Sequence, residues 1–317
     1  MGHADETYRN DALSPQTRFD EVETTISHLF RAPHPALGGR TYGQALFEAL
    51  VQRGYLPERQ VTEIGGGMGH VAEAMIAAAG DPPLRWRFVD LSPQLLAAQK
   101  ARVPSAETFP AHAEQLPFDD ASVRGLFLAN EVIADLRVEP ASAEEAASRI
   151  ARYGLDVRPD GQINVGALIL IEELSRALAP GAAACLTEFG GDFEVGAVEL
   201  GIAHRRARHL EFSIRFDHLA RAARALGFAE VERAPLADLL AIDLEQEVTS
   251  YPDIVRLRRF NARLPVLAHP RAVIEKMHPW LTRFFEFEFP KIGSPIFPNA
   301  TTQGGFAHVF HALLLKR

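Results

Sequence analysis

The chain has 317 residues, of which 47% are hydrophobic, and it carries a formal net charge of −8. A chain of this length and hydrophobic content can bury a full core, either as one large α/β domain or as one domain with an added cap. The basic residues are scattered among acids, which excludes nucleic acid as an expected partner, because an extended phosphate backbone requires a broad basic face.

Two further features concern the compartment. The first eleven residues are polar and acidic without an apolar segment, so we expect a tail rather than a secretory signal, and no apolar run approaches the length of a membrane span. The single cysteine, Cys185, lies in an apolar run. This cysteine usage fits a reducing environment, and we expect a cytoplasmic protein with no membrane partner.

Apolar spacing predicts alternating helices and strands along most of the chain. The expected helices are 17–32, 41–54, 71–79, 93–101, 141–153, 165–178 and 217–226. The expected strands are 61–64, 86–90, 125–130, 182–189, 228–233 and 306–315. This order predicts an α/β fold in which a mostly parallel sheet is covered by helices on both faces.

Residues 61–70, Val-Thr-Glu-Ile-Gly-Gly-Gly-Met-Gly-His, read as an apolar strand that turns through a glycine-rich loop into a helix. The four glycines, Gly65, Gly66, Gly67 and Gly69, allow positive φ angles and a close approach of the backbone to a ligand. Open α/β sheets bind nucleotide-like cofactors at such a loop, at the carboxyl end of a strand. A glycine-rich turn without a ligand is the alternative.

The spacing of the glycines separates two classes of cofactor. The dinucleotide fingerprint Gly-x-Gly-x-x-Gly, begun at Gly65, requires a third glycine where His70 stands. Glu63 instead precedes the first glycine by two residues, and an acid there would repel a pyrophosphate but suits a ligand with an ammonium or a sulfonium. A nicotinamide-dependent oxidoreductase is therefore disfavoured. The pattern resembles motif I of the class I S-adenosylmethionine (SAM) methyltransferases, which implies SAM as the cofactor.

Further candidates for the same pocket follow along the chain. Asp90 ends the second strand, where a carboxylate can accept hydrogen bonds from both ribose hydroxyls; a helix N-cap or a turn residue is the alternative. Leu91 would flank the adenosine. In this fold the segment before the strand 125–130 faces the adenine, a place that fits Ala113 and Glu114. Glu114 could instead be a solvated charge.

Several segments resemble one branch of these enzymes, the MidA-like methyltransferases, relatives of the mitochondrial complex I assembly arginine methyltransferase. Residues 89–95, Val-Asp-Leu-Ser-Pro-Gln-Leu, followed by Gln99, are similar to the family's Val-Glu-x-Ser-Pro-x-Leu…Gln. Tyr-Gly-Gln-Ala-Leu from Tyr42 is similar to its Phe-Gly-Glu-x-Leu, and Ala-Asn-Glu-Val, with Asn130 second, to its Ala-Asn-Glu-Phe/Leu. The resemblance implies a Rossmann-like class I methyltransferase fold with a seven-stranded sheet, and Tyr42 and Asn130 at the cofactor site. Asn130 could instead hold the turn.

The chain departs from the family pattern at two segments that would face the methyl acceptor. The family's Asn-Glu-x-x-Asp-Ala-x-Pro becomes Asn-Glu-Val-Ile-Ala-Asp-Leu at 130–136, and its Asp-Tyr-Gly becomes Glu-Phe-Gly at 188–190. The resemblance therefore implies the cofactor more strongly than the acceptor. We expect a small-molecule acceptor, such as a natural-product intermediate, with a protein arginine as the alternative.

The sequence divides into four parts. These are an N-terminal tail with helices (1–58), a SAM-binding Rossmann-like core (59–235), an insertion (236–304) and the last core strand (305–317). The insertion is too long for a simple connection and contains many aromatic residues. We expect a helical lid or substrate-shaping insertion there, and a homodimer surface is the competing explanation.

A methyltransferase mainly aligns its acceptor with the S–CH3 bond and excludes water, and a general base helps where the acceptor carries a proton. The candidate bases are Glu131, Glu188, His204 and His209. Each has a structural alternative: the carboxylates could cap a helix or pair with a cation, and the histidines could be surface or packed residues. No metal site is expected.

Two functions from different classes stay open. The first is transfer of a methyl group from SAM to an oxygen or nitrogen nucleophile. The second is a SAM-binding assembly factor with little catalysis, since intact binding residues without an identifiable base would allow it.

Overall fold

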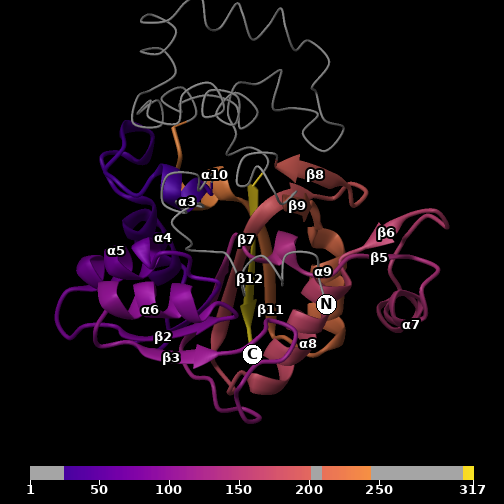
Figure 1. The fold of residues 1–317 in the computed structure, drawn as a ribbon, viewed down its shortest axis with the longest axis horizontal. Helices are drawn as coiled ribbons and strands as arrows, with labels where there is room; N and C mark the ends of the chain where they lie inside the picture. Colours follow the sequence, from indigo (N-terminus) through magenta and orange to yellow (C-terminus); the bar gives the residue numbers. More distant parts are fainter. Residues whose placement is uncertain (1–24, 201–208, 244–309) are drawn as a thin grey trace, which may run out of the picture.

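The computed structural model describes residues 25–200, 209–243 and 310–317 (Figure 1). Its main sheet has the strand order β3–β2–β1–β4–β7–β12–β11, with the short strand β10 paired to β7. The strands are β1 (Gln60–Ile64), β2 (Arg85–Asp90), β3 (Glu107–Pro110), β4 (Leu126–Asn130), β7 (Ala183–Gly191), β10 (Ile214–Arg215), β11 (Glu230–Pro235) and β12 (Phe310–Lys316).

All neighbours from β3 to β7 are parallel, whereas β12 runs antiparallel between β7 and β11. This confirms the predicted mostly parallel sheet. The six strands expected from apolar spacing omitted β3 and β10. With β3 the main path has the seven strands that the resemblance implies, and β10 pairs with β7 outside this path.

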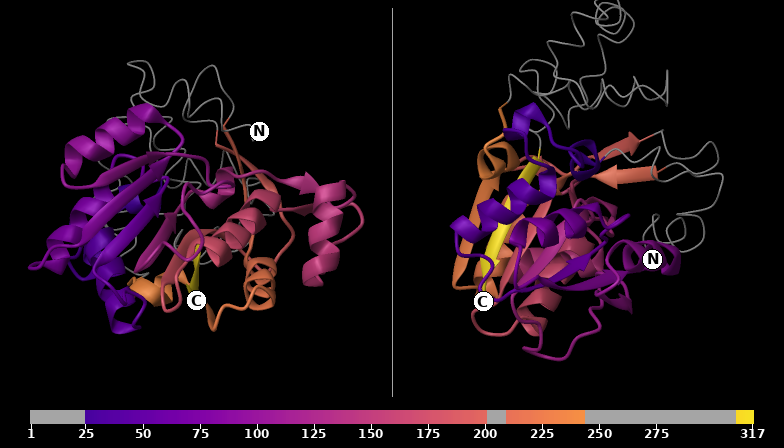
Figure 2. Two further views of the ribbon diagram at one scale, coloured as in Figure 1. Left: turned by 90° about the horizontal axis from the view of Figure 1, so that it is seen from below. Right: turned by 90° about the vertical axis from the view of Figure 1, so that its left-hand side faces the viewer.

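Helices cover both faces of the sheet (Figures 1 and 2). One face carries α4 (Tyr42–Gln52), α5 (His70–Ala79), α6 (Pro93–Arg102) and α10 (Leu236–Leu240), and the other carries α8 (Val165–Ala177) and α9 (Phe216–Ala225). Successive residues of a strand point to opposite faces. In β12, Leu314 accordingly joins the core under α4 and α5, and Leu313 and Leu315 join the core under α8 and α9.

Local sequence signals explain where the helices next to the glycine loop begin. The Thr41 hydroxyl accepts a hydrogen bond from the Gln44 amide at 3.2 Å, and the Gln44 side chain accepts one from the Thr41 amide at 2.9 Å, a capping box at the start of α4. At the start of α6 the Ser92 hydroxyl accepts a hydrogen bond from the Leu95 amide, and Pro93 occupies the first helical position.

Several connections contain elements that the sequence did not predict. Between β4 and α8 lie η2 (Ile133–Asp135), a hairpin of β5 (Glu139–Pro140) and β6 (Gln162–Ile163), and the predicted helix α7 (Glu144–Tyr153). After β7, β8 (Ala197–Leu200) pairs antiparallel with β9 (His209–Phe212).

The ends of the domain prediction fall partly outside the described residues. Of the helix expected at 17–32, the described part contains α3 (Ile26–Leu29), which is followed by η1 (Pro35–Leu37). The insertion begins with α10, and its residues 244–304 lie outside the described ranges. Within those ranges no helix is long and apolar enough to cross a membrane.

Candidate functional site

The carboxyl ends of the parallel strands meet at one edge of the sheet. Register places Ile64 of β1 beside Val89 of β2 and Ala129 of β4, and Asn130 beside Thr187 of β7. The residues that follow these strands are therefore neighbours in space. Most of the residues that the sequence singled out follow one of them.

The glycine loop follows β1 and takes conformations that favour glycine. The φ angles are +64° at Gly65, +50° at Gly67 and +78° at Gly69, which is the N-cap of α5. A Cβ on Gly65 would also lie only 2.4 Å from Cγ2 of Val132. Positive φ and lack of space together restrict this position to glycine.

Glu63 lies beneath the loop. Its side chain is 1% exposed, and its Oε2 accepts a hydrogen bond from the indole Nε1 of Trp86 at 3.1 Å. A Cβ on Gly66 would lie 3.0 Å from this carboxyl group, so the absence of a side chain lets the loop backbone approach it. Burial, together with the nearby charge of Asp90, raises the pKa of Glu63 to about 8, and the hydrogen bond from Trp86 opposes this rise.

Asp90 ends β2 and is 5% exposed. Its Oδ1 accepts a hydrogen bond from the Ser92 amide at 2.9 Å, and its Oδ2 accepts one from Nε2 of Gln99 at 2.8 Å. Burial raises the pKa of Asp90 to about 6, while these donors oppose the rise. Asp90 therefore stabilises the turn after β2, as in the structural alternative. Each of its carboxyl oxygens still has a second lone pair that could accept a hydrogen bond from a ribose hydroxyl.

Tyr42 and Asn130, predicted for the cofactor site, contact each other. Oδ1 of Asn130 accepts hydrogen bonds from the Tyr42 hydroxyl at 2.5 Å and from the Thr187 hydroxyl at 2.8 Å. Nδ2 of Asn130 donates to the Ser27 hydroxyl at 3.1 Å. Burial raises the pKa of Tyr42, so its hydroxyl remains a donor. The network ties α4, β4, β7 and the start of α3 together.

Glu131, a candidate base, holds the start of α3. Its carboxylate accepts hydrogen bonds from the Ile26 amide at 2.6 Å and from the Ser27 amide and hydroxyl at 3.0 Å each. Its own backbone has a φ of +54°, which is uncommon for a residue with a side chain. These contacts correspond to the structural alternative, in which Glu131 caps a helix.

Glu188, the second candidate carboxylate, is 3% exposed near the end of β7. Oε2 accepts a hydrogen bond from the Ala134 amide of η2 at 3.1 Å, and Oε1 accepts one from the Phe189 amide at 3.0 Å. In the register of β7 and β12, Glu188 lies opposite His311, whose ring centroid is 5.7 Å from that of Phe216. His311 was not among the residues predicted for the site, although the alternation of β12 places it on the same face as Leu313.

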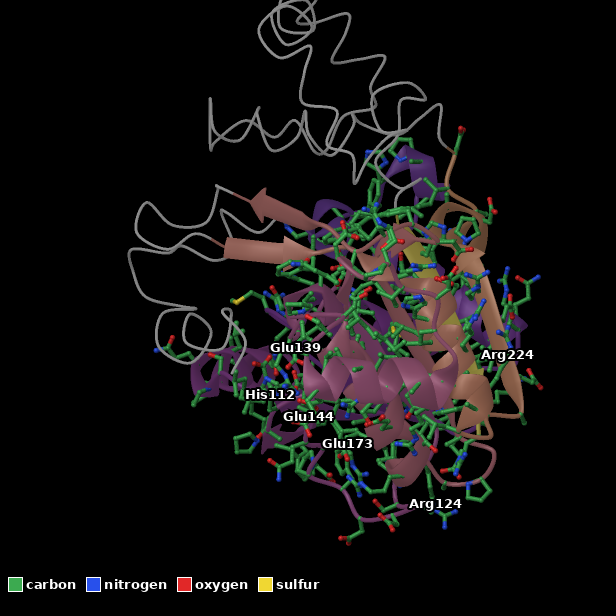
Figure 3. All side chains as sticks on the ribbon, turned by 90° about the vertical axis from the view of Figure 1, so that its right-hand side faces the viewer. His112, Arg124, Glu139, Glu144, Glu173 and Arg224 are labelled. Atoms are coloured by element: carbon green, nitrogen blue, oxygen red, sulfur yellow. The ribbon has the colours of Figure 1, made fainter. Side chains whose placement is uncertain are left out.

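Of the adenine-side candidates, Ala113 and Glu114 follow β3, and Leu91 follows β2. Ala113 is buried, Leu91 is half-buried, and Glu114 forms an ion pair with Arg137 at 3.1 Å. Glu114 is therefore not the solvated charge of the alternative interpretation. Arg137 also forms an ion pair with Glu139. Figure 3 labels Glu139 and His112, which lie near each other in that view.

The histidine candidates are only partly covered by the structure. His209 begins β9, and His204 lies outside the described residues. Over residues 25–200, 209–243 and 310–317, no group of three or more His, Cys, Asp or Glu side chains could hold a metal ion.

No protein-family model matches the sequence, and no curated protein matches it. Among solved structures, the chain is similar to a COG1565 superfamily member from Burkholderia thailandensis bound to S-adenosyl-homocysteine, at 17% identity over 87% of this chain and 76% of that chain, with a TM-score of 0.51. It is similar to an uncharacterized COG1565 superfamily protein from the same organism, at 15% identity over 96% of this chain and 87% of that chain, with a TM-score of 0.52.

A third similar structure is phosphoethanolamine N-methyltransferase 2 of Haemonchus contortus in complex with S-adenosyl-L-methionine, at 16% identity and a TM-score of 0.52. The alignment covers 100% of this chain and 60% of that chain. At such identities the similarity concerns the fold. The chain therefore has the Rossmann-like α/β fold of these structures.

Proposed function

We propose that this protein is a SAM-dependent methyltransferase that transfers a methyl group to an oxygen or nitrogen of a small molecule. One observation carries the proposal: the glycine loop lies next to two buried carboxyl groups, those of Glu63 and Asp90, at one edge of the sheet. Two of the similar solved structures contain S-adenosyl-homocysteine or SAM, which supports the choice of cofactor.

The residues at this edge fit a cationic nucleoside. The pKa values of Glu63 and Asp90 are raised to about 8 and about 6, because burial disfavours their charged forms. A cation beside Glu63 would stabilise its ionised form, whereas a pyrophosphate would add negative charge. Glu63 and the glycine loop would hold the amino-acid end, Asp90 the ribose, and Leu91, Ala113 and Glu114 the adenine.

The acceptor would lie where β4 and β7 end. SAM supplies an activated methyl group on its sulfonium, so the chain has to align the acceptor and exclude water. Glu131 and Glu188 both accept backbone hydrogen bonds, so we propose that alignment contributes more than a strong general base. His204 and His209 stay proposals for a base. The departures from the family pattern at 130–136 and 188–190 favour a reshaped, small-molecule pocket over a protein arginine.

Ligand binding tests the cofactor. SAM and S-adenosylhomocysteine should raise the melting temperature, and NADH should not. Gly65→Ala should abolish the shift, because the new Cβ would meet Val132. Gly154→Ala is the matched control, since Gly154 also has a positive φ of +61° but nothing within 4 Å of its Cβ position. A shift with NADH alone would contradict the proposal.

A SAM-binding assembly factor is the second candidate. The observation in its favour is that both described candidate carboxylates, Glu131 and Glu188, already act as acceptors for backbone amides. Incubation with methyl-labelled SAM and a panel of small molecules and arginine peptides distinguishes the two. A labelled small molecule supports the first proposal, a labelled peptide supports protein methylation, and binding of S-adenosylhomocysteine without transfer to any acceptor supports the assembly factor.

A further inference from the structure

We propose that Gln99 is a positioning residue that makes recognition of the cofactor ribose possible, by fixing Asp90 and the glycine loop relative to each other. This inference rests on the proposed function. Gln99 is fully buried in α6. Its Nε2 donates one hydrogen bond to Oδ2 of Asp90 at 2.8 Å and another to the carbonyl oxygen of Gly67 at 3.0 Å.

The orientation of the Gln99 amide follows from its partners. A backbone carbonyl and a carboxylate can only accept, so the NH2 group must face both, and its two hydrogens are then used. Oε1 of Gln99 is buried and has no hydrogen-bond partner among the described residues. A buried acceptor without a partner lowers stability, so packing alone would favour an apolar side chain at this position. The two donated bonds are therefore what the amide contributes.

A second side chain of α6 holds the next residue of the loop. Nε of Arg102 donates to the carbonyl oxygen of Met68 at 2.7 Å, and its Nη1 pairs with Glu73. Two successive loop carbonyls, those of Gly67 and Met68, thus point toward α6. In a trans peptide the N–H lies opposite the preceding C=O. Gln99 therefore also sets the direction of the Met68 N–H, away from α6.

These contacts join the two parts of the cofactor site. Gln99 and the Ser92 amide hold the two oxygens of Asp90, and the carboxyl group of Glu63 on the adjacent strand interacts electrostatically with Asp90. Without the Gln99 donor, the Asp90 carboxyl would lose both a fixed rotamer and a stabiliser of its ionised form. It would then discriminate poorly between a ligand with ribose hydroxyls and one without.

The test compares two ligands in two variants. Calorimetric Kd values are measured for S-adenosylhomocysteine and for its 2′-deoxyribose analogue. Wild-type protein should bind the former about tenfold to hundredfold more tightly, as expected for hydrogen bonds to a charged group. In Gln99→Leu this ratio should fall to within about threefold of one. Gln94→Leu, on the exposed side of the same helix, should keep the wild-type ratio.

The outcomes separate this inference from the proposed function. If wild-type protein binds no S-adenosylhomocysteine, the proposed function fails. If it binds, a wild-type ratio near one or an unchanged ratio in Gln99→Leu overturns the role of Gln99. A purely structural role would lower the melting temperature without changing the ratio.

A second variant keeps the test decisive if Gln99→Leu does not fold. In Gln99→Glu the introduced carboxyl can donate one hydrogen bond to Asp90 in acid, but two ionised carboxylates repel each other at higher pH. Its affinity for S-adenosylhomocysteine should fall by about tenfold more than that of wild-type protein between mildly acidic and mildly alkaline pH. Parallel pH profiles would overturn the inference.

Discussion

At the scale of single residues, three carboxyl groups near the carboxyl edge of the sheet are distinguished by their partners. Glu63 contacts an indole N–H, Asp90 contacts the Ser92 amide and a glutamine, and Glu131 contacts the amides of α3. An indole N–H is a single neutral donor, so it compensates burial of a charge only partly. This difference explains why Glu63 has the higher pKa of the two buried groups, Glu63 and Asp90.

The raised pKa of Glu63 predicts a pH-dependent stability. The pKa rises from 4.5 to about 8 on folding, so the folded state binds more protons between these values. The free energy of unfolding should therefore fall as pH rises through this window, by at most about 1.4 kcal/mol per pH unit from this group. Urea denaturation near pH 5 and near pH 8 should show a smaller fall for Glu63→Gln than for wild-type protein.

Glu144→Gln is the control for that measurement, because Glu144 is exposed at the start of α7 (Figure 3). It should keep the pH dependence of wild-type protein. The same dependence in Glu63→Gln would show that the Glu63 carboxyl is ionised in the folded state throughout the window.

A second residue-scale prediction concerns Glu131. In Glu131→Gln an amide replaces the charged acceptor of the Ile26 and Ser27 amides, which should lower the free energy of unfolding by about 1 kcal/mol. Turnover should fall less than tenfold, because the contacts of Glu131 hold the start of α3 in place and do not position a base. Denaturation and kcat are measured on the same variant. Unchanged stability with a loss of about 10²–10⁴ in kcat would instead identify a general base.

At the scale of elements, the contact between α4 and α5 sets the place of the glycine loop, because α5 begins at the end of the loop. Gly43 is the closest point of this contact. A Cβ there would lie 2.6 Å from Cβ of Ala74 and 2.9 Å from the carbonyl oxygen of Val71. Neither atom belongs to a flexible side chain, so the two helices could accommodate it only by moving apart.

Gly43→Ala should therefore destabilise the protein. Alanine favours a helix over glycine by about 1 kcal/mol, but overpacking of this kind costs about 1–3 kcal/mol, so the clash should dominate. The displaced α5 should also weaken binding of S-adenosylhomocysteine. Denaturation and calorimetry measure the two effects. Gln52→Ala, at the exposed end of α4, should change neither, and a stabilised Gly43→Ala would show that the helices separate easily.

At the scale of the whole molecule, the sheet depends on a strand from the far end of the sequence. β12 lies between β7 and β11. Leu314 of β12 pairs with Cys185 of β7 on one side and with Glu232 of β11 on the other. Leu314 is fully buried in the core shared with α4 and α5. The residues of the C-terminal strand thus complete a core that begins with the N-terminal helices.

Leu314→Ala should lower the free energy of unfolding by about 2–5 kcal/mol, since the cavity would open in the middle of the sheet. Val51→Ala is the control, because Val51 is 50% exposed on α4 and its replacement should change stability by less than about 0.5 kcal/mol. Urea titrations of both variants test this. Similar small effects would mean that β12 contributes little to the cooperative fold.

Much of the sheet edge that we propose to bind the cofactor could be predicted from local sequence. The strand that ends before Gly65, the turn through the glycines and the capped helix after Ser92 are short-range patterns, and the structure contains each of them. β3 was missed because its four residues contain a proline and are mostly exposed, so no apolar run marked it. His311 was missed because only its pairing with β7 brings it to Glu188.

By itself, the sequence determined the order of the longer helices and strands, the glycine loop and the acids at the ends of the first two predicted strands. Those features depend on hydrophobic period and on backbone preferences, which act between near neighbours. Only the tertiary structure decided that Glu131 holds α3 and that Gln99 joins Asp90 to Gly67. The hydrogen bonds of Glu131 to α3 and of Gln99 to Gly67 join residues far apart in the chain, and they form only after the sheet has brought its strand ends together.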